Sequence, residues 1–350
     1  MRLGLPREIK DGEFRVALTP HGVAGLACEV VVEPGAGTGI GFSDEDYLEQ
    51  GARTGNPWDC EIVLKVKELQ PAEYRKPRPG QVVLGFQQFA AEPELLDAAL
   101  ASGATFVVYS TVGQESGRFP ILAPMSAIAG RLAVQVGAWC LQRQNGGSGV
   151  LLSGLDGVPP GKVAIVGAGN VGSNALHVAH GLGARVAVHA RSEKHIAALR
   201  SKYPAARFHG NLAMLEKSVA DADLVIGGVF NPGQVSPKLI SRELLARMRP
   251  GSALVDVCID HGGIAETSRP TTHSAPIYVE EGVVHYCVPN MPAACARTAS
   301  LALENALLPF IPQLLSGSYD GALKAGIQVK AGKVVHEQLA RDTRRSHAPA

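Results

Sequence analysis

The chain of 350 residues is long enough for two domains that each bury a core. Its formal net charge is +1 and only 19% of its residues are charged, so nothing in the composition attracts nucleic acid or an anionic membrane. No run of about 18 apolar residues occurs, and the N-terminus lacks a signal peptide's apolar stretch. We therefore expect a cytoplasmic protein that binds neither nucleic acid nor a membrane.

Six cysteines are scattered along the chain without a CxxC pair. Several lie in apolar segments, where a reduced, buried thiol is the expected state. The sequence accordingly predicts neither a disulfide framework nor a metal site.

Up to about residue 125, short apolar runs alternate with helical patterns. Runs of this length are typical of buried strands, which we predict at 29–32, 62–66, 82–86 and 105–109. Helices are predicted over 43–51 and 93–102. The second of these begins with Pro93, which suits a first helical turn.

A long helical pattern over 126–145 follows and is interpreted as a bridge between domains. Beyond it, strands are predicted at 162–166, 185–189, 224–226, 253–257 and 284–288, with a helix over 174–182. Strands that alternate with helices predict a parallel, doubly wound sheet of the Rossmann type. A last helical pattern, 291–315, is expected to return to the first domain.

The glycine turn from Gly167 to Gly172 directly follows a predicted strand and opens a helix, as a dinucleotide-binding fingerprint requires. Gly167 permits the tight turn, Gly169 lets a pyrophosphate approach the backbone, and Gly172 lets helix and strand pack closely. Asn170 and Val171 begin the helix whose N-terminus would bind the phosphates. The alternative is a purely structural turn.

The end of the next strand indicates which dinucleotide binds. An NAD site normally carries an acidic residue there for the ribose 2′-hydroxyl, but the first carboxylate is Glu193, further round the turn. Arg191, Ser192 and Lys194 (or His195) could instead bind a 2′-phosphate. This pattern favours NADP(H), with NAD(H) possible, unless the charges are simply a solvated run.

The opening from Arg7 to Pro20 resembles the N-terminus of alanine dehydrogenases and of the nicotinamide nucleotide transhydrogenase α subunit. Further segments resemble the family in the same order along nearly the whole chain: 64–68, 123–126, 129–131, 254–256, 259–263, 268–272 and 290–292. The resemblance is closer to alanine dehydrogenase. It implies a substrate domain of residues 1–125 plus 292–350, completed by a C-terminal helix, and a dinucleotide-binding domain over 126–291.

The resemblance also implies roles for individual residues. Arg15 and Lys67 match the pair that binds a substrate carboxylate, which guanidinium and ammonium groups hold strongly. Asp260 matches the catalytic aspartate beside the substrate amine and nicotinamide, although it could also cap a turn. The remaining implied contacts are Phe86, Met125 and Asn290 for substrate, and Ser126, Val229, Phe230 and Met291 for the cofactor.

One departure from the family concerns catalysis. The family's catalytic histidine falls on Gln88, whose amide can donate a hydrogen bond to a carbonyl but cannot accept a proton near neutral pH. Loss of a general base typically costs about 10²–10⁴-fold in rate. His261, next to Asp260, could restore a proton shuttle or could be an ordinary loop histidine.

We therefore predict an NADP(H)-preferring oxidoreductase that interconverts a small 2-oxo acid or imine and an L-amino acid by hydride transfer. One alternative is an opine-type synthase, in which another amino acid supplies the amine. A second is a non-catalytic cofactor-binding protein, which the change to Gln88 permits. The resemblance implies a homo-oligomer, specifically a hexamer.

Overall fold

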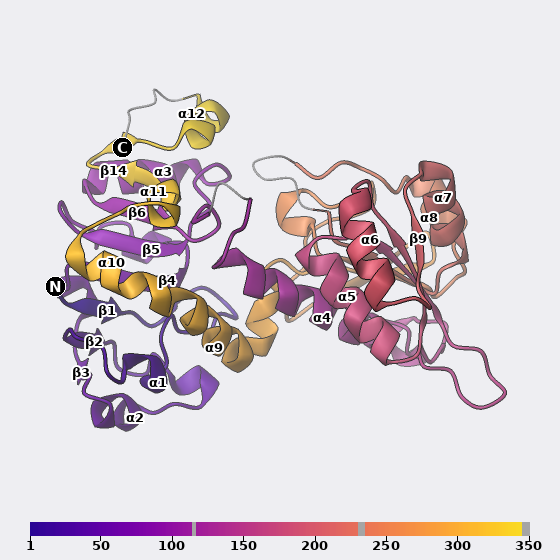
Figure 1. Ribbon diagram of the computed structural model, residues 1–350, viewed down its shortest axis with the longest axis horizontal. Helices are drawn as coiled ribbons and strands as arrows, with labels where there is room; N and C mark the ends of the chain where they lie inside the picture. Colours follow the sequence, from indigo (N-terminus) through magenta and orange to yellow (C-terminus); the bar gives the residue numbers. More distant parts are fainter. Residues whose placement is uncertain (114–116, 230–234, 345–350) are drawn as a thin grey trace. The chain divides into compact units, whose positions relative to one another are not determined.

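The computed structural model describes residues 1–113, 117–229 and 235–344. Their contacts divide the chain into unit 1, Met1–Met125 with Cys295–Ala350, and unit 2, Ser126–Ala294. Each unit is built around one sheet flanked by helices (Figure 1), which confirms the predicted two-domain α/β fold class. The boundaries fall at 125/126 and 294/295, where the sequence predicted 125/126 and 291/292.

The sheet of unit 1 contains six parallel strands in the order 3-2-1-4-5-6, followed at the β6 edge by β14, antiparallel to β6, and β15, antiparallel to β14. Its strands are β1 (Leu3–Leu5), β2 (Val30–Val32), β3 (Arg53–Thr54), β4 (Ile62–Lys67), β5 (Val82–Phe86), β6 (Thr105–Val108), β14 (Ile327–Lys330) and β15 (Lys333–Val334). The strand order changes direction between β1 and β4, which are hydrogen-bonded neighbours.

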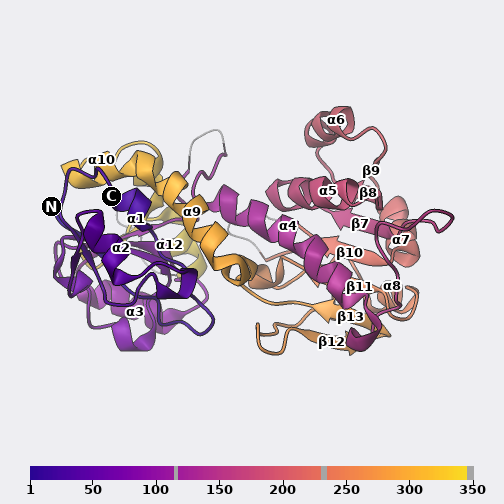
Figure 2. The ribbon, with the colours of Figure 1, turned by 90° about the horizontal axis from the view of Figure 1, so that it is seen from below.

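Helices cover both faces of this sheet. On one face, α3 (Pro93–Ser102) and α12 (Glu337–Thr343) share an apolar cluster with β4, β5, β6 and β14. The segment with α9 (Ala296–Leu307) and α10 (Ile311–Ser316) returns from the far end of the chain, and α10 and α3 lie on opposite sides of the unit (Figure 2). The Oγ of Ser300 on α9 accepts the Val16 N–H at 3.0 Å.

The sheet of unit 2 repeats the same strand order, with one antiparallel edge strand added beside the sixth parallel strand. Its strands are β7 (Lys162–Val166), β8 (Arg185–His189), β9 (Arg207–His209), β10 (Leu224–Gly227), β11 (Ala253–Asp256), β13 (Val283–Tyr286) and the edge strand β12 (Ile277–Glu280). The order changes direction between β7 and β10.

Helices α4 (Leu122–Cys140) and α5 (Asn170–Gly181) pack so closely in unit 2 that a Cβ at Gly130 would overlap the Val171 carbonyl. Helices α7 (Leu212–Asp221) and α8 (Arg242–Ala246) share an apolar cluster with β7, β10 and β11. The remaining helices are α1 (Pro20–Val23), α2 (Asp44–Glu49), α6 (Glu193–Lys202) and α11 (Ala322–Gly326). No helix in the described part of the chain is long and apolar enough to cross a membrane.

Four predicted helices have different bounds. The helix predicted over 43–51 is α2, which is shorter at both ends. The bridge helix predicted over 126–145 is α4, which starts earlier because Pro124 is tolerated in a first turn, and ends at Cys140. The helix predicted over 174–182 starts at Asn170, inside the glycine turn. The pattern over 291–315 becomes a 3₁₀ turn (Met291–Cys295), the 12-residue helix α9, a second 3₁₀ turn (Leu308–Phe310) and α10. Pro309 and Pro312, which cannot donate helical hydrogen bonds, lie at the break after α9.

Several short strands were not predicted from the sequence: β1, β3, β9, β12, β14 and β15. All six have two to four residues, too few for a periodic signal. The omission of β14 matters most, because it pairs antiparallel with β6 across more than two hundred residues of chain. The C-terminal segment therefore adds two strands to the sheet of unit 1 as well as helices.

Candidate functional site

In a doubly wound sheet, ligands bind at the carboxyl ends of the strands, where the strand order changes direction. Residues singled out from the sequence lie at this position in both units. In unit 1, Arg15 follows β1, and Lys67 ends β4. In unit 2, Gly167 follows β7 and Val229 lies just beyond β10.

Arg15 is held by a carboxylate two residues earlier in the chain. Its Nε donates to Glu13 Oε1 at 2.7 Å, and an Nη donates to Glu13 Oε2 at 2.5 Å, so the pair is bidentate. The other Nη lies 3.3 Å from Met125 Sδ. Both charged side chains are almost fully buried. The bidentate pair fixes the plane of the guanidinium, which a carboxylate-binding arginine needs.

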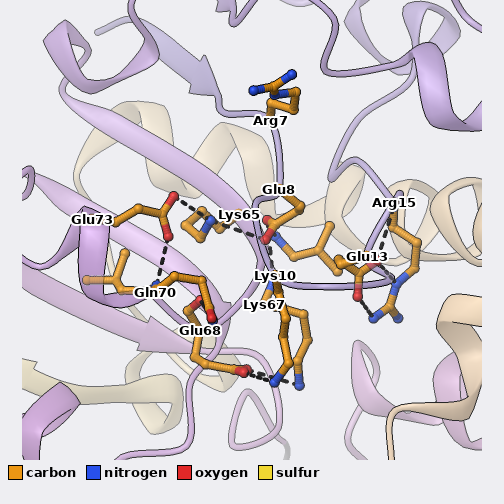
Figure 3. A network of polar contacts seen from close by, with 12 residues as sticks. Arg7, Glu8, Lys10, Glu13, Arg15, Lys65, Lys67, Glu68, Gln70 and Glu73 are labelled. Carbon is orange, nitrogen blue, oxygen red and sulfur yellow. Dashed lines mark hydrogen bonds and ion pairs between the residues drawn. The ribbon is translucent and has the colours of Figure 1, made fainter. Parts of the chain in front are cut away.

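Lys67 lies in a second charged cluster, on the last residue of β4 (Figure 3). Its Nζ is 3.1 Å from Glu68 Oε2, and Lys10 also donates to Glu68. Burial raises the pKa of Glu68, but the ammonium of Lys67 and the hydrogen bond from Lys10 outweigh this, so its pKa is lowered. Lys10 and Lys67 therefore share the carboxylate of Glu68, and Glu92 lies within electrostatic range of all three groups.

Residues Phe86 to Gln88 leave β5 beside the end of β4. Phe86 is half-buried and packs edge-on against Tyr109, with ring centroids 5.1 Å apart. Gln88 is also half-buried, whereas the side-chain oxygen of buried Gln87 accepts the Leu69 N–H at 3.1 Å. The side-chain oxygen of Gln87 is thus used in a hydrogen bond within the protein, whereas the side chain of Gln88 is more accessible to a ligand.

The glycine turn of unit 2 fits a dinucleotide. Gly167 has φ of 110°, and a Cβ there would overlap the Gly228 carbonyl. A Cβ at Gly172 would overlap the Gly167 carbonyl, so helix α5 packs directly on the turn. At Gly169, in contrast, a Cβ would meet no atom within 4 Å. The backbone is therefore open at the position where a pyrophosphate approaches, at the N-terminus of α5.

The end of β8 carries no carboxylate. The strand ends at buried His189, whose pKa is lowered to about 4 by burial and by nearby His209, and whose ring nitrogens have no hydrogen-bond partner among the described residues. Arg191 is exposed just beyond it.

Helix α6 begins directly after Arg191. Its N-cap is Ser192, whose Oγ accepts the His195 N–H at 3.4 Å, and exposed Lys194 lies in its first turn. Glu193 forms an ion pair with Arg200 at 3.3 Å. The first carboxylate after β8 is therefore paired with a cation on its own helix.

Asp260 is an exposed residue of the loop 257–264, which contains the 3₁₀ turn Ile259–His261 and which buried Asp256 holds in place. The two Asp256 carboxylate oxygens accept the backbone N–H groups of Cys258 and Ile264, so they tie both ends of the loop to the end of β11. Asp260 Oδ2 accepts the Asn290 N–H at 3.3 Å. Asn290 has φ of 57°, which is uncommon for a residue other than glycine. The structure thus brings together two residues that the sequence singled out.

Val229 is tied to the same loop through Cys258. The Val229 N–H donates to Cys258 Sγ at 3.0 Å, and the thiol donates back to the Val229 carbonyl at 3.1 Å. Burial raises the pKa of this thiol to about 12, so it stays protonated. All six cysteines are free, as the scattered spacing indicated.

The residues singled out from the sequence are shared between the two units. Unit 1 contains Arg15, Lys67, Phe86, Gln88 and Met125, and unit 2 contains Ser126, the glycine turn, the residues after β8, Val229, Asp260, Asn290 and buried Met291. Phe230 lies outside the described residues. Sequence reasoning gave no role to Glu13, Glu68 or Asp256. Glu13 and Glu68 each lie within two residues of a cation singled out from the sequence, and Asp256 ends a predicted strand; these patterns could have indicated their roles.

Comparison with known proteins gives a single result across the whole chain. The family models "Alanine dehydrogenase/PNT, N-terminal domain" and "Alanine dehydrogenase/PNT, C-terminal domain" match residues 4–129 and 133–337. The alanine dehydrogenase of Halomonas elongata is 45% identical over 97% of this chain and 96% of its own length.

Two solved structures agree with these matches. An L-alanine dehydrogenase superposes with a TM-score of 0.95 at 42% identity, covering 98% of this chain and 99% of the other. A transhydrogenase from Sinorhizobium meliloti superposes with a TM-score of 0.83 at 27% identity, covering 96% of this chain and 99% of the other.

The packing of the glycine turn predicts the effect of a single methyl group. We expect Gly172→Ala to weaken NADPH and NADH binding by about 10-fold or more and to destabilise the protein by about 1–3 kcal/mol, because the new Cβ would displace α5 from the turn. Fluorescence titration of each coenzyme and thermal melting measure the two effects.

The matched control is Gly181→Ala at the other end of α5, where a Cβ would meet no atom within 4 Å. This variant should bind both coenzymes as the wild type does. If Gly172→Ala also bound them normally, the turn would not be the coenzyme site.

Proposed function

Because the chain belongs to the alanine dehydrogenase/PNT family, we propose that it is an NADP(H)-preferring amino acid dehydrogenase. It would interconvert a small 2-oxo acid and an L-amino acid. The observation that carries the proposal is the pair of buried cations held by carboxylates, Arg15 and Lys67, in a chain whose glycine turn fits a dinucleotide. The homo-oligomer and the cytoplasmic location stay predictions.

Arg15 and Lys67 would bind the substrate carboxylate. Both are buried and held by carboxylates, so little conformational entropy is lost when a substrate binds. A guanidinium and an ammonium group together hold a carboxylate strongly, as a 2-oxo acid or amino acid substrate requires.

Asp260 would stabilise the cationic iminium group of the substrate and accept its protons. When bound, a nicotinamide ring supplies the hydride in the reductive direction. The bond from the Asn290 N–H orients the Asp260 carboxylate and leaves its other oxygen for a substrate proton.

The preference for NADP(H) rests on the residues after β8. Ala190 stands where an NAD site carries an acidic residue, and Glu193 is paired with Arg200. Exposed Arg191, Ser192 and Lys194, at the N-terminus of α6, would surround a 2′-phosphate with positive charge and hydrogen-bond donors.

Steady-state assays test the proposed activity. We expect oxidation of NADPH, faster than that of NADH, with pyruvate or glyoxylate and ammonia. Larger 2-oxo acids and primary amines in place of ammonia test the substrate range and the opine-type reaction. Tight NADPH binding without turnover on any of these pairs would contradict the proposed enzyme and favour a binding protein.

The coenzyme preference predicts an asymmetric loss in one variant. Arg191→Ala should weaken NADPH binding by about 10–100-fold, the value of a charge-assisted contact, and NADH binding much less. Arg185→Ala, which removes an exposed arginine at the opposite end of β8, is the control and should change neither dissociation constant appreciably. Equal losses for the two coenzymes in Arg191→Ala would show that Arg191 does not recognise the 2′-phosphate.

Because Gln88 stands where the family has a catalytic histidine, we expect that restoring the histidine increases alanine oxidation. Gln88→His introduces a base at a half-buried position, and we expect it to raise the rate of alanine oxidation, by up to about 10²-fold. The matched control is Gln87→His, at the neighbouring amide whose oxygen binds the Leu69 N–H. An unchanged oxidation rate in Gln88→His would mean that the missing histidine does not limit this reaction.

A further inference from the structure

Strand β4 carries two buried lysines, and a bulge separates them. Leu64 pairs with Leu84 on β5, but Lys67 pairs with Phe86, so β4 has one more residue than β5 in this stretch. A shift of one residue turns the following side chains to the other face of a sheet. Lys67 therefore leaves β4 on the face opposite Lys65, and Figure 3 shows the two side chains running in different directions.

Lys65 binds two carboxylates on its own side of the sheet. Its Nζ lies 3.1 Å from Glu8 Oε2 and 2.9 Å from Glu73 Oε1, and all three side chains are buried. Burial alone would lower the pKa of Lys65, but the two carboxylates raise it above the ordinary value, so the ammonium stays charged.

The other oxygen of Glu8 binds the bulge itself. Glu8 Oε1 accepts the Val66 N–H at 2.6 Å and lies 3.4 Å from the Lys67 N–H. A bulge removes backbone groups from the strand ladder, and a buried N–H without an acceptor is costly. The carboxylate of Glu8 supplies the acceptor that this conformation needs.

We infer that Glu8 is a positioning residue, which holds the β4 bulge so that the Lys67 ammonium points at the substrate carboxylate. Glu8 acts through the backbone of Val66 and Lys67 and does not touch the substrate. The inference rests on the proposed role of Lys67 and adds a residue to which neither the family resemblance nor the comparisons gave a role.

The test compares Glu8→Gln with Glu73→Gln, because the two residues are chemically matched. Each carboxylate gives one oxygen to the Lys65 ammonium and the other to a backbone N–H, which for Glu73 is that of Gln70 at 2.9 Å. An amide has only one acceptor oxygen, so either substitution forces a choice between the two partners. Only Glu8 has its backbone partner in the bulge.

We expect Glu8→Gln to raise the KM for pyruvate, with ammonia and NADPH, by about 10-fold or more, with kcat and the KM for NADPH changed much less. Glu73→Gln should lower Tm but leave the pyruvate KM within about 2-fold of the wild type, because Lys67 stays in place. Equal rises in the pyruvate KM of the two variants, or no rise in Glu8→Gln, would overturn the inference.

A second readout does not depend on turnover. The backbone amides of Val66 and Lys67 should exchange hydrogen faster in Glu8→Gln and at the wild-type rate in Glu73→Gln. If both variants exchange at the wild-type rate, the inference is overturned, even if the enzyme is inactive with pyruvate. Lys67→Met is the reference for the proposed function. If its pyruvate KM equals that of the wild type, the proposed carboxylate site itself is wrong.

Two triple variants keep the test informative if Glu8→Gln fails to fold. Both variants carry Lys65→Met and Glu73→Gln; one adds Glu8→Gln and the other Glu8→Ala. Each removes every charge of the buried triad of Lys65, Glu8 and Glu73. The glutamine variant retains an acceptor for the Val66 N–H without a competing ammonium, and its pyruvate KM should be near that of the wild type. The alanine variant should show the raised KM, and equal values in the two would contradict the inference.

Discussion

In a parallel sheet every strand ends at the same edge, and where the strand order changes direction, the connections from two neighbouring strands go to opposite faces of the sheet. This constraint places the candidate site residues in both units. It brings the segment after β1 and the end of β4 together in unit 1, and the glycine turn and Gly228 together in unit 2. The two sheets share one strand order, although the sequence contains no visible repeat.

The chemistry of unit 1 depends on placing cations in a buried position at low cost. An isolated buried charge is expensive, and such groups persist only when paired and hydrogen-bonded. Here Arg15 is paired with Glu13, Lys67 with Glu68, and Lys65 with Glu8 and Glu73. The four carboxylates offset the charge of the three cations and hold each cation in a fixed orientation. The ion pairs that reduce the cost of burying these cations therefore also fix the direction in which each cation points.

Patterns that repeat over many residues were readable from the sequence. The buried strands β4, β5 and β7 were predicted closely because each contains a short, mainly apolar run of about strand length. The glycine turn was informative because each glycine there meets a steric demand that other residues cannot. The family resemblance supplied Arg15, Lys67 and Asp260, for which local patterns gave no role.

Features that depend on contacts across the chain could not be read. The positive φ of Asn290, the pairing of β14 with β6 and the bulge in β4 leave no periodic trace. Glu8 looked like an ordinary charged residue near the N-terminus, because its partners on β4 become clear only when β1 lies beside β4. Tertiary packing decides these details, and a single sequence shows only local preference.

The return of the C-terminal segment to the sheet of unit 1 affects the order in which the protein can fold as it is made. Unit 2 is one continuous stretch of chain, and its sheet can close as soon as β13 is synthesised. Unit 1 begins first, yet β6 lacks its neighbour β14 until about two hundred further residues have been added. During that interval β6 is an exposed edge, which in nascent chains invites wrong strand pairing. The part of the protein made first is thus the last to be completed.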